Sequence, residues 1–168
     1  MLLERVISGG QTGADRAALI AARAAGIPTG GWMPAGFLAH DGNHPQFAEL
    51  FGMRETASPL YPPRTGLNVK ESDATLRFAT VWDSPGEVLT LALCREQGKP
   101  HLDVNPWGEL SPEDVAQWLM TKGVRVLNVA GNSERTSPGI QESVVEFLGD
   151  VFRLLVLSKG FGNEGVKG

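Results

Sequence analysis

The chain has 168 residues, of which 42% are hydrophobic and 20% charged, so it is long enough to bury a core and ordinary in composition for a globular protein. A formal net charge of −4 without a basic run argues against nucleic-acid binding, and no apolar run is long enough to span a bilayer. The single cysteine excludes a disulfide within the chain.

Length and composition predict a single domain over residues 1–158, followed by a flexible tail over residues 159–168. No signal peptide is recognisable, which predicts a cytoplasmic protein. The three histidines lack metal-ligand spacing and a cysteine-based metal site is disfavoured, so no structural metal is expected.

The most informative stretch is the glycine-rich segment at residues 8–15, SGGQTGAD. It follows an apolar strand pattern at residues 2–7 and opens an alanine-rich helix pattern that ends at Gly26. Its glycines permit a tight turn, and the start of a helix favours an anion. We therefore predict a phosphate or oxyanion cradle made by backbone amides and the Thr12 hydroxyl. The alternative is a turn that binds nothing, because the spacing matches neither the dinucleotide fingerprint nor a P-loop.

Strand and helix patterns alternate along the rest of the chain. Further strands are predicted at residues 27–31, 74–82, 101–104 and 124–130. Helices are predicted at residues 45–51, 87–97, 112–122 and 140–157, with loops at residues 32–42 and 53–71, the latter extended and stiffened by prolines. This alternation predicts an α/β fold with a mostly parallel sheet and helices on both faces.

Three unusual turns fall at the carboxyl ends of predicted strands, at residues 9–15, 83–87 and 131–139. Because ligands bind along that edge of a parallel sheet, the three turns predict an anion pocket, although helix capping alone would explain the two Ser-Pro-Gly sequences. Arg64 in the proline-rich segment could clamp a phosphate or could be an ordinary surface arginine. The candidate ligand-binding residues are Gly9, Gly10, Gln11, Thr12, Gly13, Asp15, Arg64, Thr65, Asn68, Ser84, Gly86, Gly131, Asn132, Ser133, Arg135, Ser137 and Gly139.

Taken together, the motifs make the chain similar to a known family. They are SGGQTGAD at residues 8–15, GWMP at 31–34, RT at 64–65 with NV at 68–69, SDATL at 72–76, NVAG at 128–131 and SPGI at 137–140. The chain resembles the molybdenum carrier family, a circularly permuted YpsA-type branch of the SLOG superfamily. That resemblance implies a Rossmann-like three-layer sandwich, a homo-oligomer (dimer or tetramer) and binding of the molybdenum cofactor, a phosphate-bearing pterin, as cargo.

Two positions depart from the pattern of that family. Met33 stands where a cysteine is expected, and residues 84–87 read SPGE where relatives tend to carry Gly-Gly-Thr, so that Glu87 would oppose a phosphate. The absence of a nucleophile–base pair favours a carrier that holds an anionic pterin or nucleotide-like ligand without altering it. The wider superfamily implies two alternatives: a nucleotide N-glycosidic hydrolase with Glu87 or Asp15 as its catalytic residue, and a sensor of a nucleotide-derived signal.

Overall fold

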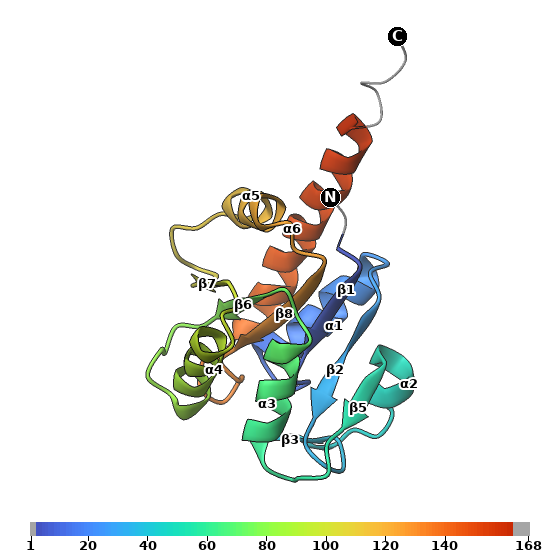
Figure 1. The fold of residues 1–168 in the computed structure, drawn as a ribbon, viewed down its shortest axis with the longest axis vertical. Helices are drawn as coiled ribbons and strands as arrows, with labels where there is room; N and C mark the ends of the chain where they lie inside the picture. Colours follow the sequence, from blue (N-terminus) through green and yellow to red (C-terminus); the bar gives the residue numbers. More distant parts are fainter. Residues whose placement is uncertain (1–2, 163–168) are drawn as a thin grey trace.

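The computed structural model of the protein describes residues 3–162 and contains one six-stranded sheet (Figure 1). Its strands are β1 (Arg5–Ser8), β2 (Thr29–Met33), β5 (Met53–Glu55), β6 (Ala74–Phe78), β7 (His101–Val104) and β8 (Val126–Gly131). The strand order is β5-β2-β1-β8-β6-β7, and every neighbouring pair is parallel. This arrangement confirms the predicted Rossmann-like α/β fold.

The apolar core lies between one face of the sheet and three helices, α1 (Ala14–Ala24), α5 (Pro112–Lys122) and α6 (Ile140–Gly162). Small alanines of α1 let it pack closely against the sheet and against α6, which contributes Val144, Leu148 and Phe152. Strand residues at every second position, such as Leu76 and Phe78, point into this core. The far end of α6 extends beyond the sheet (Figure 1).

The opposite face of the sheet is polar, and it is covered by α3 (Tyr61–Lys70) and α4 (Pro85–Glu96). Arg77 on β6 is almost fully buried, and its Nη2 donates to the backbone carbonyl of Glu87 at 2.9 Å. On the same face, the Asn128 side-chain amide donates to the Thr75 hydroxyl at 3.1 Å. The residues that α4 buries are Glu87, Thr90 and Cys94. A polar interior on this side places charged groups next to the edge where ligands bind in such sheets.

Two predicted loops contain regular structure. Residues 53–71 form β5 and α3, because the prolines after Tyr61 occupy the first turn of a helix, where no backbone N–H donor is needed. Within residues 32–42, β2 continues to Met33, and a hairpin follows from β3 (Leu38–Ala39) and β4 (Gly42–Asn43). The hairpin leads into the short helix α2 (Phe47–Phe51).

The last helix is longer than predicted. It continues to Gly162, so the expected tail at residues 159–168 is helical in its first part, and residues 163–168 lie outside the described region. None of the helices in the described part of the chain is both long and apolar enough to cross a membrane.

Candidate ligand-binding site

A cavity of about 380 Å³ opens at the carboxyl ends of the central strands. It is bounded by the turn before α1, the tip of the β3–β4 hairpin, one side of α3, the first turns of α4 and the segment after β8. The volume lies within the range of small-molecule sites. The sheet edge predicted from the three unusual turns is therefore where this cavity is found.

The structure brings together only part of the predicted set. The predicted residues that line the cavity are Gln11, Asp15, Arg64, Thr65, Ser84, Gly86, Glu87, Gly131 and Ser133. The predicted residues outside its lining are Gly9, Gly10, Thr12, Gly13, Asn68, Asn132, Arg135, Ser137 and Gly139.

The glycine-rich turn uses its amides inside the chain. Thr12 N–H donates to the side-chain oxygen of Gln11 at 2.9 Å, and Gly13 N–H donates to the side-chain oxygen of Gln141 at 2.9 Å. The backbone N–H of Gly10 donates to the Ser8 hydroxyl at 3.3 Å, and the backbone N–H of Ala14 donates to the carbonyl of Asn132 at 3.1 Å. These donors are already satisfied, so the turn shapes the cavity wall rather than offering all its amides to an anion.

The glycines of this turn are required by close approaches. A Cβ on Gly13 would lie 2.2 Å from the backbone oxygen of Asn132, and a Cβ on Gly9 would lie 2.2 Å from Nη1 of Arg64. A Cβ on Gly10 would meet the sulfur of Met33 at 2.7 Å, where Met33 is fully buried. Gly9 therefore gives the Arg64 guanidinium its space beside the turn.

The helices that start at this edge differ in which groups accept hydrogen bonds from their first backbone N–H groups. The Glu134 carboxylate accepts from the backbone N–H groups of Gly139 and Gln141 and so caps α6. At α4, the Ser84 side chain makes no cap hydrogen bond to the backbone and donates instead to the Glu87 carboxylate. Within the described chain, the first-turn amides of Gly86 and Glu87 have no acceptor, and both residues line the cavity. The start of α4 therefore offers free amides at the positive end of a helix to this site.

Arg64 supplies a positive charge with unused donors. Its side chain is 13% exposed, and its Nη1 lies 3.6 Å from the Asp15 carboxylate, which is beyond hydrogen-bond length. Its Nε is buried without a partner, and the guanidinium carbon lies 5.3 Å from the centre of the Tyr61 ring. In the described residues no acceptor takes a hydrogen bond from this guanidinium, so its donors are available to a ligand.

Two carboxylates line the same cavity. Burial raises the pKa of Asp15 from its ordinary 3.8 to about 6, although the charge of Arg64 opposes the rise, and the nearby Glu87 charge adds to it. The Glu87 carboxylate accepts from Ser84 and from the side-chain nitrogen of Asn132 at 2.9 Å. Asn132 also accepts from the backbone N–H groups of Thr80 and Val81, which fixes the loop before α4.

Other predicted residues hold the surrounding loops. Asn68 bonds both backbone groups of Trp32, accepting at 2.9 Å and donating at 3.1 Å. The Ser137 hydroxyl lies 2.7 Å from that of Thr80. Arg135 is exposed at the turn after β8.

The prediction from sequence missed several lining residues, namely His40, Tyr61, Pro62, Pro85, Leu89, Thr90, Ala130 and Thr136. Tyr61 could have been found, because a helix beginning there places Tyr61, Arg64 and Thr65 on one side by their spacing of three and four residues. His40 stands at the tip of a hairpin, where Asp41-Gly42 is a turn signature but says nothing about which residues lie near the tip in space. In the described region, no group of three or more His, Cys, Asp or Glu side chains is placed to hold a metal ion.

Comparisons with known proteins agree with this architecture. A model described as the "Circularly permutated YpsA SLOG family" matches residues 6–152. Among solved structures, the chain is similar to one named "Putative molybdenum carrier protein" from Syntrophus aciditrophicus, with 37% sequence identity and a TM-score of 0.80. The similarity covers 89% of this chain and 94% of that one. No protein with curated annotation matches. The match over most of the chain and the similarity in structure together show that this protein belongs to the circularly permutated YpsA family of SLOG proteins.

Proposed function

We propose that this protein is a molybdenum cofactor carrier, which binds an anionic, phosphate-bearing pterin or nucleotide-like ligand in the cavity described above. The observation that carries the proposal is Arg64, a mostly buried cation with unused donors beside the uncapped start of α4. A planar guanidinium and free helix-start amides are the groups that bind a phosphate best. The name of the similar protein supports molybdenum-related cargo.

The remaining lining gives the ligand an orientation. Tyr61, Leu89, Pro62 and Ala130 provide apolar surface that a flat ring can cover. Asp15 and Glu87 are acceptors, so they fit N–H or O–H groups of the ligand. The proposed ligand therefore has a compact anionic end at Arg64 and α4, and a donor-rich, flat part toward the carboxylates.

Native mass spectrometry of freshly purified protein, followed by denaturation and identification of the released molecule, tests the cargo. Release of a pterin or of molybdate would support the carrier function. Release of a nucleotide would support the nucleotide-like ligand and contradict pterin cargo.

Matched arginine variants test the location of the site. We expect Arg64→Ala to lower the occupancy of the copurified ligand at least tenfold, because a charge-assisted, bidentate contact contributes about 1.5–3 kcal/mol. Arg23→Ala removes an exposed arginine at the end of α1, away from the cavity lining, and should leave the occupancy unchanged. Equal occupancy in both variants would contradict the placement at Arg64.

One observation favours a second candidate, a nucleotide N-glycosidic hydrolase. Asp15 and Glu87 line one cavity, and an acid with a pKa of about 6 can donate a proton near neutral pH. Incubation with nucleoside 5′-monophosphates and chromatography for the released base tests this activity. Base release that disappears in both Asp15→Asn and Glu87→Gln would favour the hydrolase over the carrier.

We also propose that the protein is a homo-oligomer, either a dimer or a tetramer. Its support is α4, which buries polar residues and leaves Val88 exposed on its outer side. An apolar outer face on a helix is typical of a surface covered by another subunit.

A further inference from the structure

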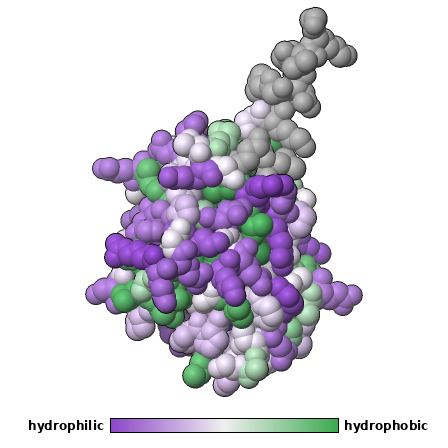
Figure 2. All heavy atoms as spheres, viewed as in Figure 1, coloured by the Kyte–Doolittle hydropathy of each residue, from purple (hydrophilic) through white to green (hydrophobic). Residues whose placement is uncertain are grey.

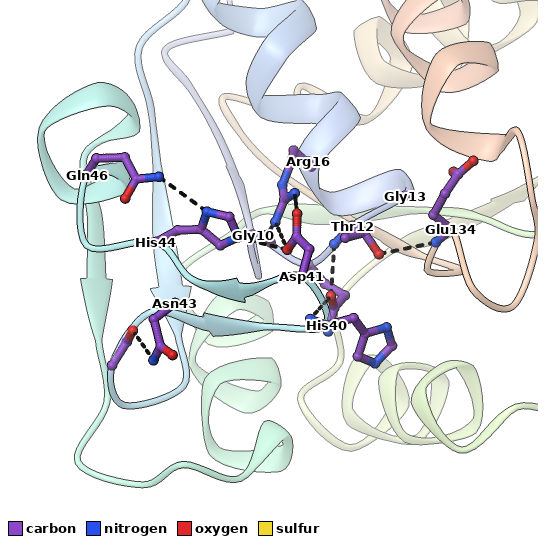
Figure 3. A network of polar contacts seen from close by, with 12 residues as sticks. Gly10, Thr12, Gly13, Arg16, His40, Asp41, Asn43, His44, Gln46 and Glu134 are labelled. Atoms are coloured by element: carbon purple, nitrogen blue, oxygen red, sulfur yellow. Dashed lines mark hydrogen bonds and ion pairs between the residues drawn. The ribbon is translucent and has the colours of Figure 1, made fainter.

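The hairpin formed by β3 and β4 brings a titratable side chain, His40, to the cavity. His40 and Asp41 form its two-residue tip, and His40 is part of the cavity lining. The hairpin does not belong to the main sheet, and polar contacts join its tip to α1 and to the turn before α1. Figure 3 shows those contacts around the hairpin tip.

Both residues of the tip are held by hydrogen bonds. The Asp41 carboxylate accepts from both terminal nitrogens of Arg16 on α1, and from His44 Nε2 at 2.7 Å. The backbone N–H of His40 donates to the side-chain oxygen of Gln11 at 2.9 Å. The same Gln11 donates to the Tyr61 hydroxyl at 3.3 Å, so one amide joins the hairpin, the glycine-rich turn and α3. Figure 3 shows the His40 ring extending beyond the end of the hairpin, away from the Arg16–Asp41 pair.

The ring of His40 lies near positive charges from two other elements. Burial lowers the pKa of His40, the charge of Arg135 lowers it further, Asp41 opposes these effects, and the charge of Arg64 adds to the lowering. The Tyr61 ring meets the His40 ring edge-on, with 6.2 Å between their centres. Within the described residues, Arg135 makes no ion pair and Arg64 makes only the long contact with Asp15. His40 and Arg64 therefore line the same cavity, and the positive charges of Arg64 and Arg135 both oppose protonation of the imidazole.

We propose that His40 is a ligand-binding residue, which takes up a proton from solvent when an anion binds at Arg64 in the cavity and then donates a hydrogen bond to that anion. The inference rests on the proposed function, because it names a further contact of the same site. An anion placed there cancels the repulsion that the two arginines exert on a protonated imidazole. Binding is then coupled to protonation of a residue on the hairpin.

Titration of the three histidines by ¹H–¹³C NMR, with and without sodium sulfate, tests the proposal, with chloride at equal ionic strength as the reference. Sulfate keeps its charge over the range in which histidine titrates, and the Arg64 Nε–H signal reports its entry into the cavity. We expect sulfate to raise the pKa of His40 by about half a unit or more, which makes sulfate binding about threefold tighter at low pH than at high pH. His101, on the edge strand β7, should not shift.

The outcomes separate the two proposals. If the Arg64 signal moves and the pKa of His40 does not, the role of His40 is overturned and the anion site stands. If neither signal moves, the anion site fails, and the inference fails with it. The NMR measurement also separates His40 from Asp15, whose carboxyl titrates in the same range.

A pair of arginine variants gives a second measurement that needs no ligand. Arg135→Gln should raise the pKa of His40 in the sulfate-free protein, because it removes a positive charge that acts on the ring. Arg153→Gln removes an exposed arginine of α6 that pairs with Asp150, and it should leave His40 unchanged. No difference between the variants would overturn the grouping of His40 with Arg135.

Discussion

Asp15 determines how charge is balanced inside the cavity. Its side chain is nearly fully buried, and its carboxylate lies near Arg64. Burial makes the ionised carboxylate unfavourable, and Arg64 compensates only part of that effect. An anion bound to Arg64 would draw on the same positive charge, so ligand binding should favour protonated Asp15.

The first prediction concerns the pH dependence of stability. Because the pKa of Asp15 is raised in the folded protein from 3.8 to about 6, its contribution to the free energy of unfolding is fully present at low pH and is lost as the pH rises through about 6. The shift corresponds to about 3 kcal/mol. In urea unfolding, the stability of Asp15→Asn relative to the wild type should therefore increase by about 2.5 kcal/mol from about pH 4 to about pH 8.

An exposed aspartate provides the control for this prediction. Asp150 on α6 has a side chain that is 51% exposed and pairs with Arg153. Asp150→Asn should show no comparable gain between the two pH values. A gain of equal size in Asp15→Asn at both pH values would mean that burial does not raise the pKa of this carboxyl.

Among the elements, the turn from β1 into α1 illustrates how distant parts of the chain determine a local conformation. Gly13 has φ +88°, and the backbone of Asn132 passes so close that a Cβ would lie 2.2 Å from its oxygen. Gly26, at the other end of α1, has φ +74° with nothing near a Cβ. The two glycines share a positive φ, but Gly13 combines it with a ψ of −134°, and only Gly13 also needs the space.

These two glycines give a matched prediction. Gly26→Ala should lower the free energy of unfolding by about 1 kcal/mol, which is the usual effect of a left-handed conformation on a residue with a Cβ. Gly13→Ala should lower it by more than about 2 kcal/mol, because the clash with backbone forces β8 and α1 apart. Urea unfolding monitored by circular dichroism measures both, and equal losses would contradict a packing role for Gly13.

How far the sequence predicts this structure also depends on the element. The strand predicted at residues 74–82 is present but ends at Phe78, and the helix opened by Ser111 is found as predicted. Both follow from local patterns, since hydrophobic spacing and a capping box act over a few residues. The helix α3 was missed because its prolines were interpreted as an extended loop rather than as a first turn.

The candidate site also has features that local patterns predict and features that they do not. The parallel sheet predicted which edge holds the cavity. Which helix start remains free could not be predicted, because Gly13 is satisfied by Gln141, more than a hundred residues away in sequence, and α6 is capped by Glu134. The position of His40 at the cavity likewise depends on a residue distant in sequence, because its backbone N–H donates to Gln11.

At the scale of the whole molecule, the sheet separates two environments. The face toward α1, α5 and α6 holds the main apolar core, whereas the face toward α4 holds Arg77, Thr75 and Asn128. An α4 that turns polar groups inward has few polar groups left to face solvent. Figure 2 shows hydrophobic residues interrupting the hydrophilic surface on the side where α4 lies.

The last prediction concerns the assembly of the protein. Val88 on α4 is 55% exposed, and Val156 near the end of α6 is 54% exposed. The two valines are therefore equally exposed but lie on different helices, which makes Val156 a matched control. If α4 forms the contact between subunits, Val88→Glu buries an unpaired charge in that contact and should reduce the mass of the assembly. Val156→Glu should leave the mass unchanged. Size-exclusion chromatography with light scattering measures both, and circular dichroism verifies that each variant is folded. A monomeric wild type would contradict the proposed homo-oligomer, and loss of assembly in Val156→Glu alone would place the contact on α6 instead.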